Sequence, residues 1–273
     1  MRKNLDQKII FALLALVMVF GFFFSHPLHI AIEPPVLAAY NTIGQLKPGD
    51  VVVMSMDYGP STMPEVSPAA YAMLRQLFQE KVKVIFMTLW NEGLPMIDDA
   101  IQKVCIPMGE KENVDYVNLG YKYGGLTSSV VMDEMGTNLK GVFPVTIDGI
   151  PYNNIPFLKK IHSLKDVSLL IDISAGSPGS IEYVQYVQAK YHIPIVAAVS
   201  KVMTPQNYPF YNAHQLLGLC SGIMGGAEYE ELVHHPGFGM TALFIQSLAH
   251  LLIVFLILEG NILYFFFRKK EKG

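Results

Sequence analysis

The sequence has few cysteines, few charges and none of the short motifs that mark common catalytic or cofactor sites. Its 273 residues include two cysteines and one tryptophan, and only 16% are charged. It contains no Gly-x-x-x-x-Gly-Lys-Ser/Thr loop, no Gly-x-Gly-x-x-Gly, no Gly-x-Ser-x-Gly, no His-Glu-x-x-His and no Cys-x-x-Cys. These absences argue against a P-loop site, a dinucleotide fingerprint, a nucleophile elbow and a zinc protease. We therefore expect neither a cofactor nor a metal.

The two cysteines, Cys105 and Cys220, are too few for a disulfide framework. In an oxidising compartment they would either form one disulfide or remain as two buried thiols. Their spacing in the sequence does not distinguish these two alternatives.

The charged residues are unevenly placed along the chain. Seven of the 20 Lys+Arg lie near the ends, which leaves 13 basic and 20 acidic residues between them, a difference of 13 − 20 = −7. A middle region this acidic is a poor match for nucleic acid or for an anionic lipid surface.

Two apolar segments bracket this acidic region. One runs over 9–24 behind Arg2, Lys3 and Lys8, and the other runs over 240–267 and stops at three basic residues, 268–270. A hydrocarbon layer about 30 Å thick requires roughly 20 apolar residues, and Lys and Arg stay on the cytoplasmic side. The pattern predicts a two-pass protein of the cytoplasmic (inner) membrane, with both termini cytoplasmic and the central domain periplasmic or extracellular.

This topology divides the chain into five parts: a transmembrane anchor (1–25), a connector (26–50), an extracytoplasmic α/β domain (51–238), a second transmembrane helix (239–267) and a basic cytoplasmic tail (268–273). A cleaved signal peptide is the alternative for the first part, although Ser25-His26-Pro27 makes a poor cleavage site.

Strand and helix patterns alternate in the central region. Continuous apolar runs at 51–56 and 84–89 are typical of strands buried on both faces, and helical periodicity lies between them. Ser67 followed by Pro68 predicts the start of that helix, as an N-cap and a first-turn proline. The same order of elements recurs over 167–199.

The two βαβ units predict an α/β fold with a doubly wound, mostly parallel, Rossmann-like sheet between the two transmembrane helices. Weaker patterns predict helices at 38–43, 95–104 and 130–135 and strands at 116–119 and 142–145.

Glycines recur at a spacing of four in the last part of the domain. Gly218, Gly222 and Gly226 lie in a stretch, 214–233, whose pattern predicts one helix. Glycines at this spacing clear one helix face, so either the helix packs tightly on its own sheet or it forms a contact between subunits.

The second apolar segment carries polar residues that favour a further contact. Gln246, His250 and Asn261 fall within about 60° of one another on a helix, with Glu259 nearly opposite. Polar groups at membrane depth tend to face protein, although the outer and inner interfaces also tolerate them.

Polar residues also gather at the predicted carboxyl ends of the strands, where ligands bind in open parallel sheets. The candidate catalytic residues are Asp57, Ser61, Asp172 and Ser177, and the candidate ligand-binding residues are Tyr58, Gly59, Trp90, Gly176 and Gly179. Paired carboxyl groups can do general acid–base work, but an aspartate at a strand end commonly binds loop amides instead. Ser177 and Pro178 can likewise mark the start of a helix, as an N-cap followed by a proline in the first turn.

Three local sequences resemble a family of membrane-anchored prokaryotic proteins. They are Gly49-Asp50-Val51-Val52-Val53 with Asp57-Tyr58-Gly59, the run from Asp115 to Tyr121, and the run from Gly225 to Glu230. The resemblance spans most of residues 45–233. No activity is established for that family, so it implies domain limits and no catalytic residue.

The sequence as a whole favours a non-catalytic subunit or scaffold of a larger membrane assembly. Its expected partners are the lipid bilayer and either further copies of the chain or other membrane subunits, with no nucleic acid. A hydrolase or small-molecule transferase that uses Asp57 and Asp172 is the first alternative, and a tethered solute-binding sensor is the second.

Overall fold

The computed structural model describes residues 2–26 and 29–270. They fall into two compact units: Ile30–Gly239, and a unit that contains α1 and most of α11. Three short parts of the chain lie outside the described residues: Met1, residues 27–28 and residues 271–273. Residues 27–28 belong to the predicted connector, and residues 271–273 belong to the predicted cytoplasmic tail.

One parallel sheet forms the centre of the larger unit. Its six strands are β1 (Val51–Asp57), β2 (Lys83–Thr88), β3 (Tyr116–Tyr121), β4 (Leu169–Ser174), β5 (Ile195–Val199) and β6 (Gly218–Ser221). They are arranged in the order β3-β2-β1-β4-β5-β6, and every neighbouring pair is parallel. The chain adds strands on one side of β1 and then returns to the other side at β4. The predicted doubly wound α/β fold is confirmed, with the switch in direction between β1 and β4.

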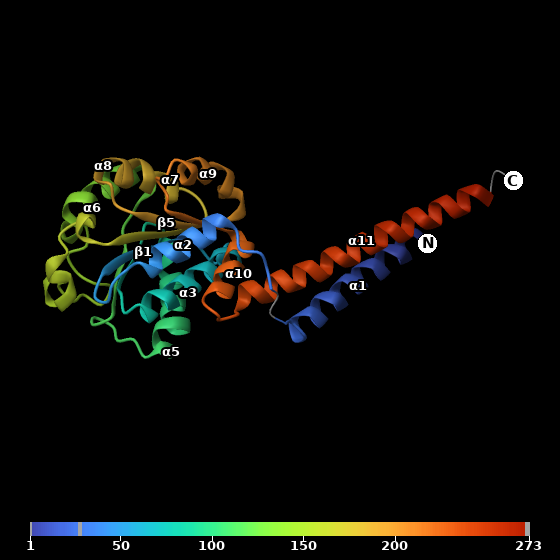
Figure 1. Cartoon of the computed structure of the whole chain (residues 1–273), viewed down its shortest axis with the longest axis horizontal. Coiled ribbons are helices and arrows are strands. Elements are labelled where there is room, and N and C mark those ends of the chain that lie inside the picture. Colours follow the sequence, from blue (N-terminus) through green and yellow to red (C-terminus); the bar gives the residue numbers. More distant parts are fainter. Residues whose placement is uncertain (1, 27–28, 271–273) are drawn as a thin grey trace. The chain divides into compact units, whose positions relative to one another are not determined.

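Helices cover both faces of this sheet. The first face carries α2 (Pro34–Gly44), α3 (Met63–Gln79), α4 (Leu94–Ala100), α5 (Ile106–Met108) and α10 (Gly222–Leu232). The second face carries α6 (Ser128–Val142), α7 (Ser180–Tyr183), α8 (Ala189–Tyr191) and α9 (Thr204–Asn212). In Figure 1 the second set lies along one side of the sheet, and α3 and α5 lie along the other.

Short turns of other helix types complete these elements. Two π-helical turns, Ile101–Cys105 and Val184–Gln188, join α4 to α5 and α7 to α8. The 3₁₀ turns are Asn91–Gly93, Gly125–Thr127, Tyr152–Asn154, Pro156–Lys160, Leu164–Asp166 and Lys201–Met203.

The sheet is buried because its strands are apolar on both faces. Val52 and Met54 of β1 pack under the first set of helices, whereas Val51 and Val53 pack under the second. Fully burying one side chain of this size stabilises a fold by about 1.5–3 kcal/mol. The unbroken apolar runs therefore predicted the central strands correctly, and the predicted helices at 38–43, 95–104 and 130–135 also lie within helical segments.

The prediction of one helix over 214–233 is wrong in its first half. Residues 218–221 form β6, and α10 begins only at Gly222. A Cβ on Gly218 would lie 2.3 Å from the Cα of Ala39 in α2, and a Cβ on Gly226 would lie 2.8 Å from the Cβ of Pro68 in α3. The three glycines share no helix face, because their spacing of four runs across a strand–helix junction.

Two further local predictions are wrong. Helix α3 begins at Met63, so Ser67 and Pro68 lie inside it, and Pro64 occupies the first turn instead. The strand predicted over 142–145 does not form: Val142 ends α6, and Val145 makes only an isolated bridge to Pro151. Val142 and the next residue are apolar because they are buried at the end of a helix.

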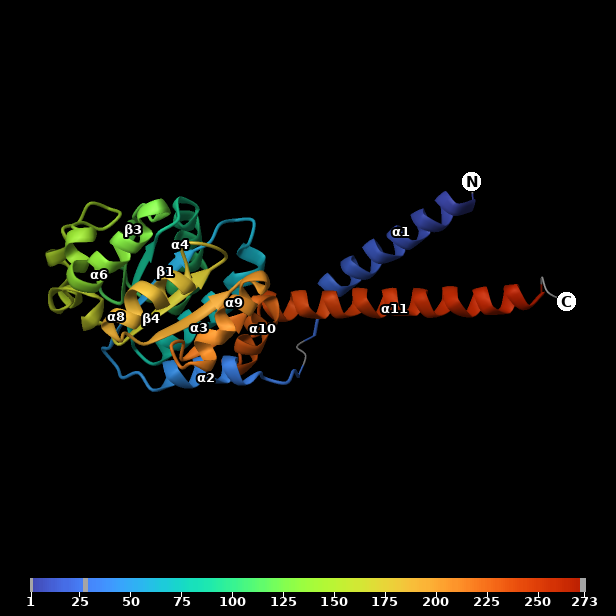
Figure 2. The same cartoon turned by 90° about the horizontal axis from the view of Figure 1, so that it is seen from above.

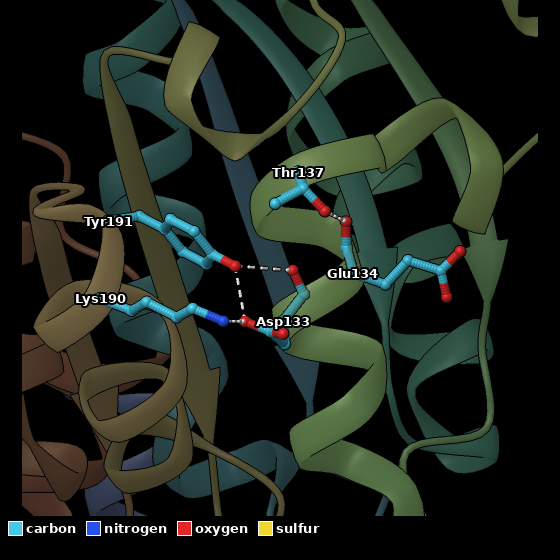
Figure 3. A network of polar contacts seen from close by, with 5 residues as sticks. All are labelled: Asp133, Glu134, Thr137, Lys190 and Tyr191. Carbon is cyan, nitrogen blue, oxygen red and sulfur yellow. Dashed lines mark hydrogen bonds and ion pairs between the residues drawn. The ribbon is translucent and has the colours of Figure 1, made fainter.

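A polar network joins α6 to α8 at the surface of the second helix layer (Figure 3). Asp133 accepts hydrogen bonds from Lys190 and from the hydroxyl of Tyr191. The Tyr191 ring lies against Gly136, where a Cβ would be 2.0 Å from Cε2. Lys165 also sits 4.7 Å from the ring centroid. Because Gly136 has no side chain, the Tyr191 ring can pack against α6 at this position.

The two apolar helices are α1 (Arg2–Phe23) and α11 (Phe238–Lys270). Of the helices that the structure describes, Phe238–Ile262 is long and apolar enough to cross a membrane, and the apolar part of α1, Gln7–Phe23, is shorter. Within their own unit the helices meet at Gly21, where a Cβ would lie 3.1 Å from Cγ1 of Ile245. One helix is thus a candidate membrane span.

Candidate functional site

Four polar side chains converge where the carboxyl ends of β1 and β4 lie side by side. The register of the two strands pairs Ser55 with Asp172 and Asp57 with Ser174. Residues two apart on a strand point to the same face, so all four side chains lie on one face of the sheet. Each of them is fully buried.

Asp57 is held by hydrogen bonds from three groups. Its Oδ2 accepts from Ser55 Oγ at 2.5 Å, and its Oδ1 accepts from the Leu89 amide at 2.6 Å and from Thr88 Oγ1 at 3.2 Å. Burial raises the pKa of Asp57 to about 6, and these hydrogen bonds limit the rise.

Asp172 is less well satisfied. Its Oδ2 accepts from Ser174 Oγ at 2.5 Å, whereas its buried Oδ1 has no hydrogen-bond partner. Burial raises the pKa of Asp172 well above its ordinary value, and the nearby charge of Asp57 raises it further. The pKa values of both carboxyl groups are therefore raised, and the causes for Asp172 include the charge of Asp57.

Hydroxyl groups lie beside the pair, and the nearby charge of Glu182 also raises the pKa of Asp172. The hydroxyl of Tyr183 lies 2.9 Å from Ser55 Oγ and is fully buried. Within residues 2–26 and 29–270, no Lys, Arg or His forms an ion pair with either aspartate. Two carboxyl groups without a cation can exchange a proton, and this is the chemistry that the arrangement offers.

Three loops meet above the pair and close over it. Trp90 Nε1 donates to the carbonyl of Pro178 at 2.8 Å, and a Cβ on Gly176 would lie 3.0 Å from the Trp90 ring. A Cβ on Gly124 would lie 2.9 Å from both Leu89 and Pro178. These contacts join the loops after β2, β3 and β4, and the contact between Gly59 and Glu92 adds the loop after β1. Because Asp57 and Asp172 are fully buried, the loops form a cover rather than the open crevice that was predicted.

The structure separates the other predicted site residues from this pair. Ser61 and Ser177 are exposed, and Ser177 Oγ donates to Glu182 at 2.5 Å. Tyr58 is buried in the opposite core, with its hydroxyl 2.9 Å from Ser67 Oγ.

Two of the predicted ligand-binding glycines have structural contacts. A Cβ on Gly59 would lie 2.2 Å from Oε2 of Glu92. Gly179, and not Ser177, precedes α7, and its amide donates to Glu182 at 2.9 Å. The interpretation of Ser177 as the N-cap is therefore wrong, because the chain turns into the helix two residues later.

Ser55, Thr88, Ser174 and Tyr183 complete the pair and were not predicted. The available signal was the alternation Ser-Met-Asp at 55–57 and Asp-Ile-Ser at 172–174, which places two polar residues on one face of an otherwise apolar strand.

A second set of carboxyl groups lies on α10. Glu228 is fully buried, and its Oε2 accepts from the amide of Glu33 at 2.9 Å. Glu230 is 4% exposed, and its two oxygens accept from the amides of Gly237 at 2.9 Å and Gly239 at 3.0 Å. One helix therefore fastens both the segment that enters the larger unit and the segment that leaves it. Both views place α10 beside α3 (Figure 2), with which it packs.

A cavity of about 680 Å³ opens at the amino ends of β1 and β2, lined by Lys83, Phe157 and Lys160 among others. Neither Asp57 nor Asp172 lines it. Among the described residues, no group of three or more His, Cys, Asp or Glu is placed to hold a metal ion. Cys105 and Cys220 are free and buried, so no disulfide joins them.

Comparison of the chain with models of protein families, with characterised proteins and with solved structures gave no match.

Proposed function

We propose that this chain is a membrane-tethered α/β module that serves as a non-catalytic subunit or scaffold of a larger membrane assembly. Both apolar helices would cross the bilayer, with both termini cytoplasmic and the α/β unit on the outer side. The basic residues at the outer ends of these helices support this orientation.

The observation that carries the proposal is the pair of carboxyl groups on α10. Glu228 and Glu230 are two residues apart and bind the backbone of the two segments that connect the α/β unit to the apolar helices. Buried carboxylates that accept amide hydrogen bonds fix chain segments, so the two end segments of Ile30–Gly239 are held on one helix of their own unit. A unit whose two end segments are bound to the same helix suits a module that is attached through both ends.

The closed cover above Asp57 and Asp172 supports a non-catalytic role as well. Both side chains are fully buried, and the indole of Trp90 is bonded across the cover. A substrate would have to displace this loop before it reached either carboxyl group.

Gentle extraction from native membranes, followed by mass measurement of the intact particle, tests the assembly. We expect a particle of fixed stoichiometry that is larger than the 30.4 kDa chain. A lone monomer, stable across several mild detergents, would argue against it.

Labelling of an exposed residue tests the topology. Lys159 is exposed on the α/β unit, and the two natural cysteines are buried, so Lys159→Cys gives a single accessible thiol. An impermeant maleimide should label it in intact cells. Labelling only after the membrane is opened would place the unit on the cytoplasmic side.

A second function, acid–base catalysis at Asp57 and Asp172, is favoured by one specific observation. The buried Oδ1 of Asp172 has no partner, which costs about 1–3 kcal/mol if nothing fills the gap. A hydrolase or transferase would open the cover and offer this oxygen a substrate group. A thermal-shift screen with small metabolites tests this function and the sensor alternative, since a ligand of the folded state raises the melting temperature. A hit that Asp172→Asn abolishes would support a ligand site at the pair.

A further inference from the structure

A small cavity lies where α3 and α10 meet the segment that leads into α11. Its volume is about 80 Å³, and its lining includes Tyr71 and Arg75 of α3, Glu230 of α10, and His235 and Phe238. This cavity is distinct from the carboxyl pair of Asp57 and Asp172, which lies at the carboxyl ends of β1 and β4.

Arg75 is the only residue of this lining with a permanent positive charge. Its Nη2 donates to the carbonyl of Lys103 at 3.3 Å. Across the part of the chain that the structure describes, no carboxylate forms an ion pair with it. Most of its five N–H groups therefore remain able to bind an anion.

The acidic groups around Arg75 already have partners. The two oxygens of Glu230 accept from the amides of Gly237 and Gly239. The hydroxyl of Tyr71 donates to Asp99, which also forms an ion pair with Lys103 at 2.9 Å. The negative charge of Glu230 acts on Arg75, but both Glu230 oxygens accept from backbone amides, and the guanidinium lines the cavity beside them.

His235 adds a hydrogen-bond donor at the same place. Burial lowers the pKa of its imidazole, and the charge of Arg75 lowers it further. At neutral pH the ring is uncharged and keeps one N–H.

Phe238 sets the depth of the cavity relative to a bilayer. It is the first residue of the apolar stretch Phe238–Ile262, and 52% of its surface is exposed. A group that lines a cavity with the first residue of a membrane span lies at the level of the lipid headgroups, where the phosphates are. Arg75 is thus placed where a phosphodiester is present at high local concentration.

We infer that Arg75 and His235 bind the phosphate of a phospholipid headgroup beside Phe238. This inference rests on the membrane tether proposed above. The guanidinium fork matches two oxygens of one phosphate, and His235 can donate to a third. The net charge of −7 opposes broad adsorption to an anionic surface, but it does not oppose one directed contact with a phosphodiester, a group that zwitterionic phospholipids also carry.

The test uses the full chain in nanodiscs and counts retained lipids by native mass spectrometry. The discs contain either phosphatidylcholine or a phosphate-free galactolipid. We expect wild type to retain phosphatidylcholine in preference to galactolipid, and Arg75→Ala to reduce that retention roughly tenfold. Lys159→Ala, which removes an exposed lysine far from this cavity, is the matched control and should retain lipid as wild type does. Equal retention by Arg75→Ala would overturn the inference, provided its thermal unfolding matches wild type.

Two further experiments complete the test. The first distinguishes a lipid phosphate from free phosphate, and the second distinguishes a failure of the headgroup site from a failure of the membrane tether. Inorganic phosphate at millimolar concentration should not displace the lipid; displacement would assign the position to free phosphate and overturn the lipid source. Alkaline extraction of membranes should leave the chain in the pellet. If the chain is released, the membrane tether and the headgroup position both fail, whereas a chain that stays embedded but is insensitive to Arg75→Ala refutes only the headgroup position.

Discussion

Asp57 and Asp172 stand on neighbouring strands, face the same side of the sheet and share a buried environment without a cation. Between them, Ser55 donates to Asp57 and lies in register with Asp172. The strand order changes direction between these two strands, so the connections that follow them lead away to opposite sides. The polar residues lie at this switch point of the sheet.

The stability of the protein should depend on the ionisation of this pair. Burial raises the pKa of Asp57 to about 6, against about 4 in an unfolded chain, and it raises the pKa of Asp172 in the same direction. The folded state therefore binds more protons than the unfolded state over this range. The contribution of Asp57 to stability is highest below about pH 4 and falls by roughly 3 kcal/mol as the pH rises through about 6.

Urea unfolding of the full chain in mild detergent, measured at several pH values, checks this dependence. Asp57→Asn removes the titrating group but keeps an oxygen for the Leu89 amide, so the fall between pH 4 and 6 should flatten. Glu134→Gln, which alters an exposed carboxyl on α6, serves as the control. A wild-type profile that rises with pH over this interval would contradict the assignment.

Gly218 should not accept a side chain. A Cβ at this position would meet the backbone of Ala39 in α2, so Gly218→Ala must push α2 away from β6. We expect a loss of about 1–3 kcal/mol in the free energy of unfolding. Gly109→Ala tests whether the effect is specific: it also lies outside helix and strand interiors, but no atom is within 4 Å of its Cβ position, and its φ of +81° strains the backbone only. Gly218 has no positive φ, so a loss in Gly218→Ala that is no larger than the loss in Gly109→Ala would contradict a close contact with α2.

Substitution of Gly222 by leucine does not test whether the start of α10 forms a contact between subunits. The φ of Gly222 is +57°, and Glu65 and Lys201 lie 3.1 and 3.2 Å from a Cβ placed there. Gly222→Leu would therefore strain the start of α10 whether or not the chain forms an oligomer. The polar residues of α11 give a better test of association: Gln246→Leu and His250→Leu should weaken the assembly without affecting the α/β unit.

Both thiols should be unreactive in the folded protein. Cys105 and Cys220 are 0% and 1% exposed, and burial raises the pKa of Cys105 to about 12. A buried thiol that stays protonated is a poor nucleophile. Maleimide should label neither cysteine under native conditions and both in denaturant, as counted by intact mass. Rapid labelling of one cysteine in the native state would show that its helix layer opens.

Glu228 should stabilise the entry of the chain into the α/β unit through hydrogen bonding rather than through charge. Burial raises the pKa of Glu228, so ionisation of this group is costly in the folded state. Glu228→Gln keeps an acceptor for the Glu33 amide and should retain wild-type stability at pH 8. Glu228→Ala loses the acceptor and should cost about 1–3 kcal/mol.

Limited digestion with proteinase K should show the local effect of that substitution. Cleavage should accelerate near residues 30–34 in Glu228→Ala and remain slow in Glu228→Gln and in Glu134→Ala, a change at an exposed site on α6. If Gln and Ala have the same effect, the carboxylate charge matters more than the hydrogen bond.

The sequence predicted the sheet because β1, β2, β4 and β5 are continuous apolar runs, a pattern that only doubly covered strands require. β6 was missed because it has four residues, one of which is glycine, and it runs directly into α10. Local periodicity cannot distinguish so short a strand from a helical turn.

The candidate site was predicted in position but not in character. Asp57, Asp172 and Trp90 do come together, because parallel strands bring their carboxyl ends to one edge. That the loops close over the carboxyl groups depends on tertiary contacts, such as the hydrogen bond from Trp90 to Pro178, which no local pattern encodes. The contact of Glu228 could not be predicted because its partner, Glu33, is 195 residues away. The partners of Glu230 are only seven and nine residues away, but they lie beyond the end of α10, where no helical periodicity applies.

The attachment of both connecting segments to α10 has a mechanical consequence. Tension applied between residue 33 and residue 237 would be carried by a few residues of one helix, around Glu228 and Glu230, and would bypass the sheet. The strands would bear little load while the two connections were pulled apart. The α/β unit should therefore keep its sheet intact when tension is applied to its two end segments.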